Sequence, residues 1–285
     1  MLIAIIVFII LCILLYTWYE FHSKLKLHID LKNPKLSKDL KLIKKYLKTS
    51  DGLKISSWFM PVKNPKAVLI LVDGYKETNE DKIRMFGHAE YLRKAGYSTL
   101  LLDLRSFGES EGDKITFGIN EWKEVEAAYD YMKALTENKN KKIGFLGISM
   151  GGVISIITKG VTGKGDFIIA STPYANFDSL FNFRIRKRGL PSFLFLPFLK
   201  LAAILELGFD YEQYSPLNMI KKIHVPILIT SAKKDLKVNS TDAKTLYDAA
   251  NKPTEYWKAD TSHRIFKDNP EEFKKTVLSF LEKYV

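Results

Sequence analysis

Cysteine is almost absent from this 285-residue chain, in which Cys12 is the one cysteine. An intramolecular disulfide and a zinc site built from several thiolates are therefore excluded, and packing must hold the fold together. Histidine, aspartate and glutamate residues form no cluster at the spacing of metal ligands, so we expect no bound metal. No G-x-G-x-x-G fingerprint follows the first strand-like segments, which argues against a nucleotide cofactor. We expect the protein to act without a cofactor.

Internal repeats and low-complexity segments are also lacking. Apolar residues make up 46% of the chain, charged residues 27% and aromatic residues 13%. This composition excludes a largely disordered or collagen-like protein. The length suits one α/β domain of about 200 to 250 residues with an additional segment.

The positive charge of the chain is unevenly distributed. Residues 20–66 contain twelve lysines and four acidic residues, and so carry +8 of the net charge of +12. No segment interleaves arginine with aromatic residues as nucleic-acid-binding surfaces do, so we expect no nucleic-acid partner. Lysines beside an apolar segment are instead typical of attraction to a membrane surface.

Charge is missing altogether from Leu2 to Tyr19. At a rise of 1.5 Å per residue, a helix of this length covers about 27 Å, close to the hydrocarbon thickness of a bilayer. Tyr16, Trp18 and Tyr19 lie at one end, where amphipathic rings favour the headgroup level. A cleaved signal peptide is the alternative, but the run has no Lys or Arg before it and no small-x-small site after it. We predict a single-pass membrane anchor at residues 1–20.

A basic connector is expected at residues 21–42, where Pro34 argues against one continuous helix. The lysine-rich stretch from Lys24 to Lys48 follows the anchor directly. Because cytoplasmic flanks of membrane helices are enriched in Lys and Arg, this stretch predicts that the following domain, residues 43–285, lies on the cytoplasmic side.

The domain begins with a predicted hairpin. Ile43 to Thr49 can alternate as a strand, Ser50-Asp51-Gly52 is a turn signal, and Leu53 to Met60 suits the partner strand. A basic amphipathic helix is the competing interpretation. Its apolar face would consist of Leu36, Leu40, Ile43 and Leu47.

Strand-like and helix-like segments then alternate along the chain. Strands are predicted at 67–72, 98–102, 143–146, 167–170, 227–230 and 254–257, and helices at 81–94, 122–135, 151–159, 242–250 and 270–284. This alternation predicts an α/β protein with a mostly parallel sheet, helices on both faces and a leading antiparallel hairpin. Ligands of such sheets gather at the carboxyl ends of the strands. Residues 174–217, rich in Phe and Leu, are too many for an ordinary connection and are predicted to form a helical cap over these ends.

A G-x-S-x-G motif, Gly147 to Gly151, lies between a predicted strand and a predicted helix. A serine hydroxyl becomes an effective nucleophile when a sharp strand-to-helix turn exposes it and a base can reach it. Glycines two residues away on either side relieve the crowding of such a turn. A glycine-rich helix start with an incidental serine is the alternative. The motif in this position predicts Ser149 as a catalytic nucleophile.

A serine hydrolase of this architecture needs an acid and then a histidine further along the chain. His224 and His263 follow Ser149, but His224 precedes a strand and so lies at the wrong end of the sheet. His263 follows the last predicted strand and is our general base. Asp235 comes a few residues after the preceding strand and is predicted to orient the imidazole, with Asp260 as the fallback.

The oxyanion formed in such a reaction needs two backbone N–H donors. Met150, the residue after the nucleophile, is predicted to supply one. The second is expected from the loop Asp73-Gly74-Tyr75, where Gly74 permits a sharp turn and Tyr75 is the predicted donor. An ordinary strand-end turn is the alternative for this loop.

Together these segments resemble the serine-dependent α/β-hydrolase superfamily, in its single-domain branch of esterases, lysophospholipase-like enzymes and serine aminopeptidase-like hydrolases. The resemblance covers residues 43–285. Besides the Ser149 turn it rests on three segments: Ser50-Asp51-Gly52, Asp103 to Ser110 (DLRSFGES) and Ser215-Pro216-Leu217. It implies an α/β-hydrolase fold, with Asp103 and Arg105 bracing a structural loop near the active site rather than catalysing.

The sequence departs from the family at two places. Asp73 stands where the family usually has a histidine before the glycine of the oxyanion loop. Ser231-Ala232-Lys233-Lys234 stands where a glycine usually precedes the acid by two or three residues. Neither change removes a catalytic group.

The predicted function is that of a membrane-anchored serine hydrolase that cleaves carboxylic acyl esters. Ser149 would form an acyl-enzyme, and water activated by His263 would hydrolyse it. The expected partners are a small-molecule acyl ester or lipid substrate and the membrane. An amidase or peptidase with the same triad is one alternative, and a non-catalytic interaction protein on the same fold is the other.

Overall fold

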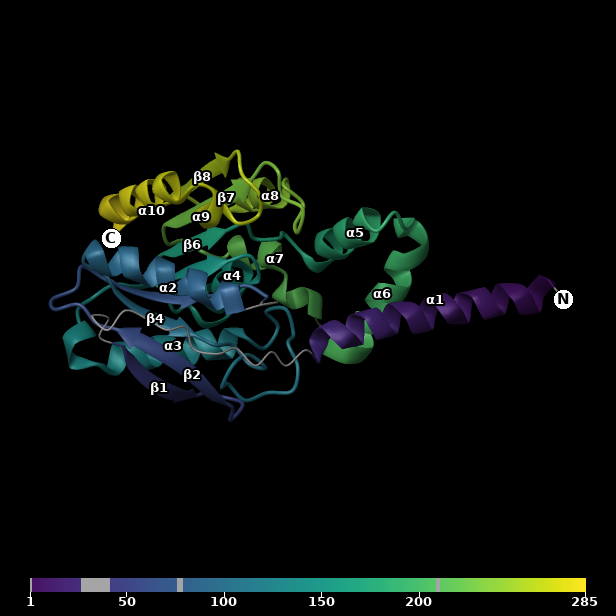
Figure 1. Ribbon diagram of the computed structural model, residues 1–285, viewed down its shortest axis with the longest axis horizontal. Helices are drawn as coiled ribbons and strands as arrows, with labels where there is room; N and C mark the ends of the chain where they lie inside the picture. Colours follow the sequence, from purple (N-terminus) through teal and green to yellow (C-terminus); the bar gives the residue numbers. More distant parts are fainter. Residues whose placement is uncertain (1, 27–41, 76–78, 209–210) are drawn as a thin grey trace.

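The computed structural model of the protein describes residues 2–26, 42–75, 79–208 and 211–285 (Figure 1). A globular part built on a central sheet carries a long N-terminal helix that projects from one side. Two further helices of the chain lie beside the root of this projection.

Within the described residues, an eight-stranded sheet has the order β1-β2-β4-β3-β5-β6-β7-β8. Strand β2 pairs antiparallel with both β1 and β4, and every other neighbouring pair is parallel. The strands are β1 (Ile43–Lys48), β2 (Lys54–Met60), β3 (Val68–Val72), β4 (Ser98–Leu102), β5 (Ile143–Ile148), β6 (Ile168–Ser171), β7 (Ile227–Ala232) and β8 (Thr254–Ala259). The predicted α/β-hydrolase architecture is confirmed.

Helices cover both faces of the sheet. Side chains of α2 and α10 pack on one face, and those of α3, α4 and α8 pack on the other. The helices are α1 (Leu2–Leu25), α2 (Asn79–Lys94), α3 (Trp122–Ala134), α4 (Met150–Thr162), α5 (Phe177–Lys187), α6 (Ser192–Leu207), α7 (Pro216–Ile220), α8 (Asp242–Ala249), α9 (Ile265–Asp268) and α10 (Pro270–Tyr284). The sequence pattern missed the single turn of α9, which is too short to show a helical period.

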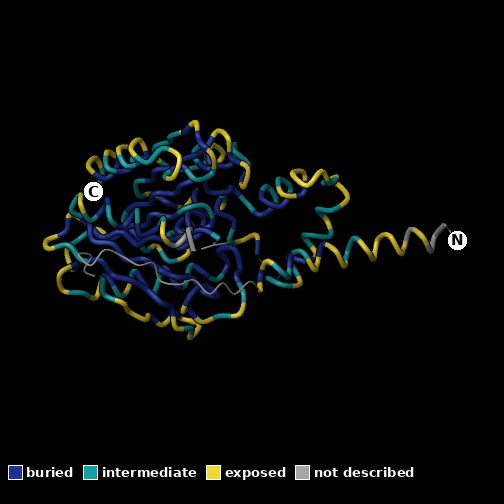
Figure 2. Tube along the Cα trace, viewed as in Figure 1, coloured by how far each residue is buried: buried dark blue, intermediate teal, exposed yellow. Residues whose placement is uncertain are grey.

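The central strands are buried on both faces because their side chains alternate between two hydrophobic clusters. In β3, Val68, Ile70 and Val72 belong to the cluster on the α3 and α4 side, and Leu69 and Leu71 to the cluster on the α2 and α10 side. All five are fully buried, as the tube in Figure 2 shows for most of the sheet. Each such side chain contributes about 1.5 to 3 kcal/mol through burial.

Strands β1 and β2 form the predicted hairpin. The Thr49 backbone N–H donates to the Leu53 carbonyl at 3.0 Å, and the Leu53 N–H donates to the Thr49 hydroxyl at 2.9 Å. The competing amphipathic helix is wrong for Ile43 and Leu47, which lie in β1. The first half of that interpretation and most of the predicted connector, residues 27–41, lie outside the described residues.

Helix α1 is longer than the uncharged run from which the anchor was predicted. It continues to Leu25, and its stretch Val7–Leu25 is long and apolar enough to cross a membrane. Its N-terminal half is mostly exposed, whereas Thr17, Phe21 and Leu25 are buried (Figure 2). These three residues are four apart and so share one face of the helix, which packs against the rest of the protein.

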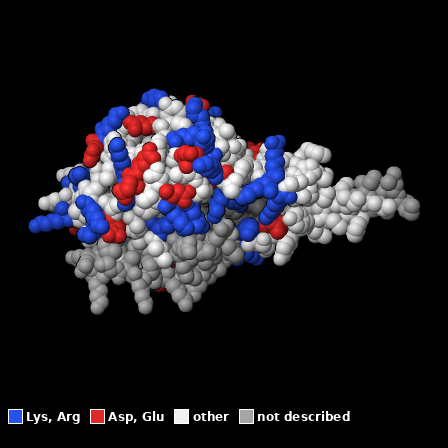
Figure 3. Space-filling view, turned by 45° about the horizontal axis from the view of Figure 1, so that its top comes forward, with Lys and Arg blue, Asp and Glu red and all other residues white. Residues whose placement is uncertain are grey.

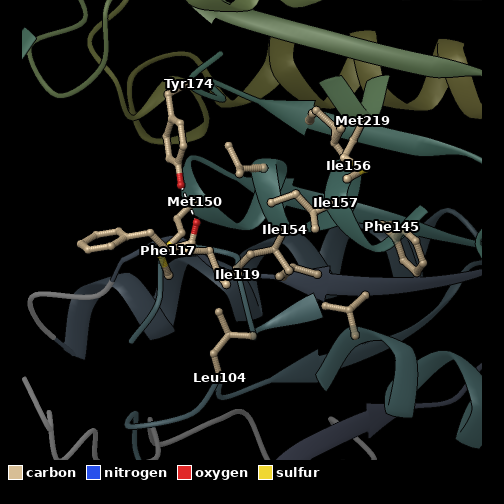
Figure 4. Close-up of a cluster of buried hydrophobic side chains, with 14 of the residues drawn as sticks. Leu104, Phe117, Ile119, Phe145, Met150, Ile154, Ile156, Ile157, Tyr174 and Met219 are labelled. Carbon is tan, nitrogen blue, oxygen red and sulfur yellow. Dashed lines mark hydrogen bonds between the residues drawn. The ribbon is translucent and has the colours of Figure 1, made fainter. Parts of the chain in front are cut away.

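The insertion 174–217 contains α5, α6 and the beginning of α7. Tyr174 fixes its start, because its buried hydroxyl donates to the carbonyl of Phe117 at 2.7 Å. Figure 4 shows this hydrogen bond beside Met150, the first residue of α4. The insertion is therefore tied to the part of the fold in which β5 turns into α4.

Candidate active site

Ser149 stands at the turn between β5 and α4. Its φ of 55° and ψ of −118° are unfavourable for a residue with a side chain, at a cost of about 1 to 3 kcal/mol. The turn is held by hydrogen bonds on both sides: the Ser149 N–H donates to the Ser171 carbonyl at 2.7 Å, and the Ser149 carbonyl accepts from Val153 N–H at 3.2 Å. The backbone therefore makes the sharp bend that the motif predicts.

Both glycines of the motif are required by close backbone contacts. A Cβ atom at Gly147 would lie 2.2 Å from the carbonyl oxygen of Gly151. A Cβ atom at Gly151 would lie 2.0 Å from the carbonyl oxygen of Val72, at the end of β3. Because the obstructing atoms are backbone atoms, no side-chain rotation relieves these contacts. The glycines thus bring β3, the Ser149 turn and α4 together.

His263 and Asp235 lie on the loops that follow β8 and β7, which are neighbouring parallel strands. Nδ1 of His263 and Oδ2 of Asp235 are 2.7 Å apart. The other carboxylate oxygen, Oδ1, accepts the backbone N–H groups of Lys237 at 2.8 Å and Val238 at 3.0 Å. An ionised carboxylate only accepts hydrogen bonds, so the imidazole proton sits on Nδ1 and leaves Nε2 as the proton acceptor.

The other candidates from the sequence lie elsewhere. Asp260 has a side chain that is 64% exposed, and it pairs with Lys234 at 3.3 Å. His224 is exposed and precedes β7, at the amino end of that strand. Within the described residues, no group of three or more His, Cys, Asp or Glu side chains is placed to hold a metal ion.

One cavity joins the predicted site residues. Ser149, Met150, Tyr75 and His263 all line it, and Asp235 contacts it through its hydrogen bond to His263. These residues come from segments far apart in the sequence. The structure brings them together at the carboxyl ends of the central strands, as parallel sheets of this kind require.

The loop after β3 is built tightly against the Ser149 turn. A Cβ atom at Gly74 would lie 2.9 Å from the carbonyl oxygen of Ile148. Asp73 is buried, and its Oδ1 accepts the Gly74 N–H at 2.8 Å. The carboxylate that stands in place of the family's usual histidine therefore closes the turn of this loop.

Tyr75 links the same loop to the N-terminal helix. Its ring stacks on Phe117 with the ring centroids 5.9 Å apart. Its hydroxyl donates to the carbonyl of Lys24, near the end of α1, at 3.1 Å. The segment predicted to bind the oxyanion is thus in direct contact with the end of helix α1, just beyond the predicted anchor.

His88 is a wall of the cavity that sequence reasoning missed. Its ring lies over Phe266, with the ring centroids 4.0 Å apart. Burial lowers the pKa of His88 to about 3, and the positive charge of Arg84 acts in the same direction, so the imidazole is neutral. On α2, His88 comes three residues after Met85 and four before Leu92, which are both buried. This spacing was the available signal that His88 lies on the buried face of the helix.

Asp242 falls in a predicted helix. It connects the segment that follows the Asp235 loop with the insertion 174–217. Its Oδ1 accepts the Ser179 hydroxyl at 2.6 Å, and its Oδ2 accepts the Ala175 N–H at 3.2 Å. Burial raises the pKa of Asp242, the two hydrogen bonds lower it, and the negative charge of Asp235 raises it further. The start of α5 is held in place by this carboxylate.

Arg105 braces the loop 103–110 and does not line the cavity. Its backbone N–H donates to Glu124 Oε2 at 3.0 Å, and its side chain donates to both Glu124 Oε1 and Asp51. Arg105 and Glu124 are buried. This arrangement agrees with the structural role that the resemblance implied for Arg105, and no motif in the sequence marks Glu124 as its partner.

Known proteins share sequence or fold with this chain. The family described as serine aminopeptidase, S33, matches residues 63–180, a segment that includes both the β3 loop and the Ser149 turn. The structure of an esterase from Pyrococcus furiosus is similar with a TM-score of 0.74 and 24% identity, over 90% of this chain and 98% of the esterase. This chain has the α/β-hydrolase fold. A second solved structure, acetyl xylan esterase 1 from Thermoanaerobacterium, is similar with a TM-score of 0.65 and 14% identity, over 95% of this chain and 94% of the other.

A curated relative of this chain is found in Bacillus subtilis. The uncharacterized protein YqkD is 29% identical over 192 residues, which are 66% of this chain and 63% of YqkD. The match therefore spans less than two thirds of the length of that relative.

Proposed function

We propose that this α/β hydrolase is a membrane-anchored serine hydrolase that cleaves carboxylic acyl esters. The observation that carries the proposal is the hydrogen bond between His263 and Asp235 at the cavity that Ser149 also lines. A serine on a strained strand-to-helix turn, an imidazole and a buried carboxylate are the parts of a Ser-His-Asp triad.

In the proposed reaction, the Ser149 hydroxyl attacks the acyl carbonyl carbon while Nε2 of His263 takes its proton. Asp235 keeps the imidazole in the required tautomer and stabilises the imidazolium. The backbone N–H groups of Met150 and Tyr75 would donate to the oxyanion. His263 then protonates the departing alcohol, and a water molecule that gives its proton to His263 releases the acid from Ser149.

Ester substrates are favoured because two structurally similar proteins are named as esterases. The matching family is described as a serine aminopeptidase, so amide or peptide hydrolysis is the second candidate. We expect turnover of p-nitrophenyl acyl esters of increasing chain length, and none of aminoacyl p-nitroanilides. Turnover confined to the anilides would replace the esterase assignment by a peptidase one.

The membrane anchor is supported by the way in which α1 ends. The Leu25 carbonyl accepts the Ile115 N–H at 2.8 Å, and the Phe21 ring packs against Phe181 with the ring centroids 5.7 Å apart. A helix that forms part of the folded protein favours a retained anchor over a cleaved leader. We place the domain on the cytoplasmic side because lysines follow the helix. Resistance of the protein to alkaline extraction from membranes tests the anchor.

Labelling with a fluorophosphonate probe tests the nucleophile. We expect the full-length protein in membrane fractions to react, Ser149→Ala to abolish the reaction and Ser240→Ala, a change away from the cavity, to preserve it. A wild-type protein that does not react would favour the non-catalytic interaction protein. Equal labelling of Ser149→Ala would show that another group is the nucleophile.

A further inference from the structure

Helix α6 exposes an apolar face that a water-soluble cap would have no reason to carry. Phe193 is 84% exposed, Leu201 41% and Leu205 67%, and Pro197 is exposed between them. The four positions are four residues apart and so follow one side of the helix. A contiguous exposed apolar surface of this kind marks a contact with another apolar phase or partner. We call these four residues the α6 stripe.

The α6 stripe lies next to the candidate membrane span. Tyr16 of α1 packs edge-to-face on Phe195 at 6.4 Å between ring centroids, and His22 of α1 bonds Glu206 at 2.6 Å. The contacts follow the same order in both chain segments, and α6 crosses α1 beside the globular part (Figure 1). The beginning of α6 is therefore level with Tyr16, inside the stretch Val7–Leu25 that can cross a membrane.

Charge is arranged around these helices as at a membrane surface. The last turn of α5 and the residue after it expose four basic side chains: Arg184, Arg186, Lys187 and Arg188. Arg188 is joined to Glu20 of α1 at 2.7 Å, which places this basic group at the level of Trp18 and Tyr19. Figure 3 shows Lys and Arg side chains where the globular part meets the projecting helices, and uncharged atoms beyond them. Basic and aromatic residues together are typical of the headgroup region.

The one cation within α6 is directed away from the stripe. Lys200 pairs with Asp178 of α5 and so faces the insertion. Glu206, the one acid of α6, is held by His22 of α1. The remaining residues of α6 are apolar except for Ser192. Both charged side chains are thus paired with groups of the protein, and the α6 stripe itself contains no charged residue.

We propose that α6 is a second membrane-contacting helix, whose stripe enters the boundary between headgroups and acyl chains of an anionic lipid leaflet beside α1. An interfacial helix of this kind inserts its apolar face about 5 to 10 Å into that boundary. The α5 basic residues then meet the lipid phosphates.

This placement sets the class of substrate, a step that rests on the proposed hydrolase function. Leu180 and Arg184 of α5 line the catalytic cavity, as does Phe117. Phe117 is in turn packed against Phe21 of α1, with ring centroids 6.3 Å apart. Phe117 thus contacts the cavity on one side and Phe21 of α1 on the other. The substrate is therefore an acyl ester taken from the leaflet rather than from water.

A fluorophore on the stripe tests the contact itself. Leu201→Cys in a full-length Cys12→Ser background is labelled with an environment-sensitive dye and reconstituted into vesicles of phosphatidylcholine and phosphatidylglycerol. We expect blue-shifted emission that brominated lipids quench. The matched control is Val161→Cys, an exposed apolar position on α4, where emission stays that of a dye in water. Unshifted emission at position 201 overturns the proposal. A blue shift that brominated lipids do not quench also overturns it, because it means that protein covers this face of α6.

Kinetics test the consequence for the substrate. The double variant Leu201→Asn, Leu205→Asn removes two apolar side chains from the stripe and none from the cavity. We expect hydrolysis of a long-chain acyl ester in vesicles to fall by about tenfold or more, with unchanged turnover of soluble p-nitrophenyl acetate. Equal loss on both substrates, or on neither, contradicts the proposal. Failure of the hydrolase assignment would instead appear as unlabelled Ser149 together with intact lipid quenching at position 201.

Discussion

Replacing Asp235 by Asn tests the proposed role of the acid most directly. The Asn carbonyl oxygen can still accept the backbone N–H groups that Asp235 Oδ1 accepts at 2.8 and 3.0 Å, so the loop keeps its shape. The amide NH₂ then occupies the position of Oδ2 and donates to Nδ1 of His263. The imidazole proton must move to Nε2, which can no longer take the proton of Ser149. We expect a loss of about 10,000-fold in kcat, or about 5 kcal/mol of transition-state stabilisation.

The assay is steady-state hydrolysis of a p-nitrophenyl ester by purified full-length protein, with a denaturation curve for each variant. We expect the unfolding free energy of Asp235→Asn to stay within about 1 kcal/mol of the wild type. Asp260→Asn is the matched control, because Asp260 is exposed and pairs with Lys234. The reasoning is refuted if Asp235→Asn keeps more than about a tenth of the activity in a stable protein, or if Asp260→Asn loses as much.

Three further predictions follow from packing and burial. Gly151→Ala should lower the unfolding free energy by more than about 4 kcal/mol, because its Cβ would lie 2.0 Å from a backbone oxygen. Gly152→Ala, with 3.2 Å to its nearest atom, should cost less in the same thermal denaturation series, and equal losses would count against this reasoning. His88 binds its proton at pH 6.5 when unfolded and at about 3 when folded, so the folded state is penalised as the pH falls below 6.5. Between pH 7 and pH 4.5, His88→Gln should therefore lose about 2 to 3 kcal/mol less unfolding free energy than the wild type, and parallel urea-unfolding profiles would exclude this. Phe21→Ala should loosen the end of α1 and speed tryptic cleavage after Lys24, whereas Phe8→Ala, at an exposed position, should not; equal cleavage rates would show that Phe21 does not hold the helix.

The sheet could be predicted from the sequence because its strands carry their own signal. A strand buried on both faces, such as β3, must be apolar at every position, and turns between such runs are marked by glycine or proline. The Ser149 turn was identifiable for a related reason. A Cβ atom at Gly147 or Gly151 would lie 2.2 or 2.0 Å from a backbone oxygen, so only glycine fits at these two positions. At these positions the packing around a residue dictates its type, so the residue type predicts the structure.

Other features depend on residues that meet only in three dimensions. His88 reaches the cavity from α2, and Glu124 reaches Arg105 from α3, without any motif near either residue. The end of α1 was placed too early because charged and polar residues follow Tyr19. Phe21 and Leu25 continue the helix because they pack on the insertion and the cavity wall, a contact that the local sequence does not reveal. The choice of Asp235 over Asp260 rested on strand position alone, and in the structure Asp235 is the one of the two that lies 2.7 Å from Nδ1 of His263.

If α1 spans a bilayer as proposed, the contacts at its end fix how the protein sits relative to that bilayer. The carbonyl of Lys24 accepts from Tyr75 and that of Leu25 from Ile115, so the last turn of the helix is clamped to the globular part. A protein clamped in this way keeps one height and one tilt above the lipid, instead of tumbling on a tether. Encounters with the proposed lipid substrate would then be a lateral search within the plane of a single leaflet.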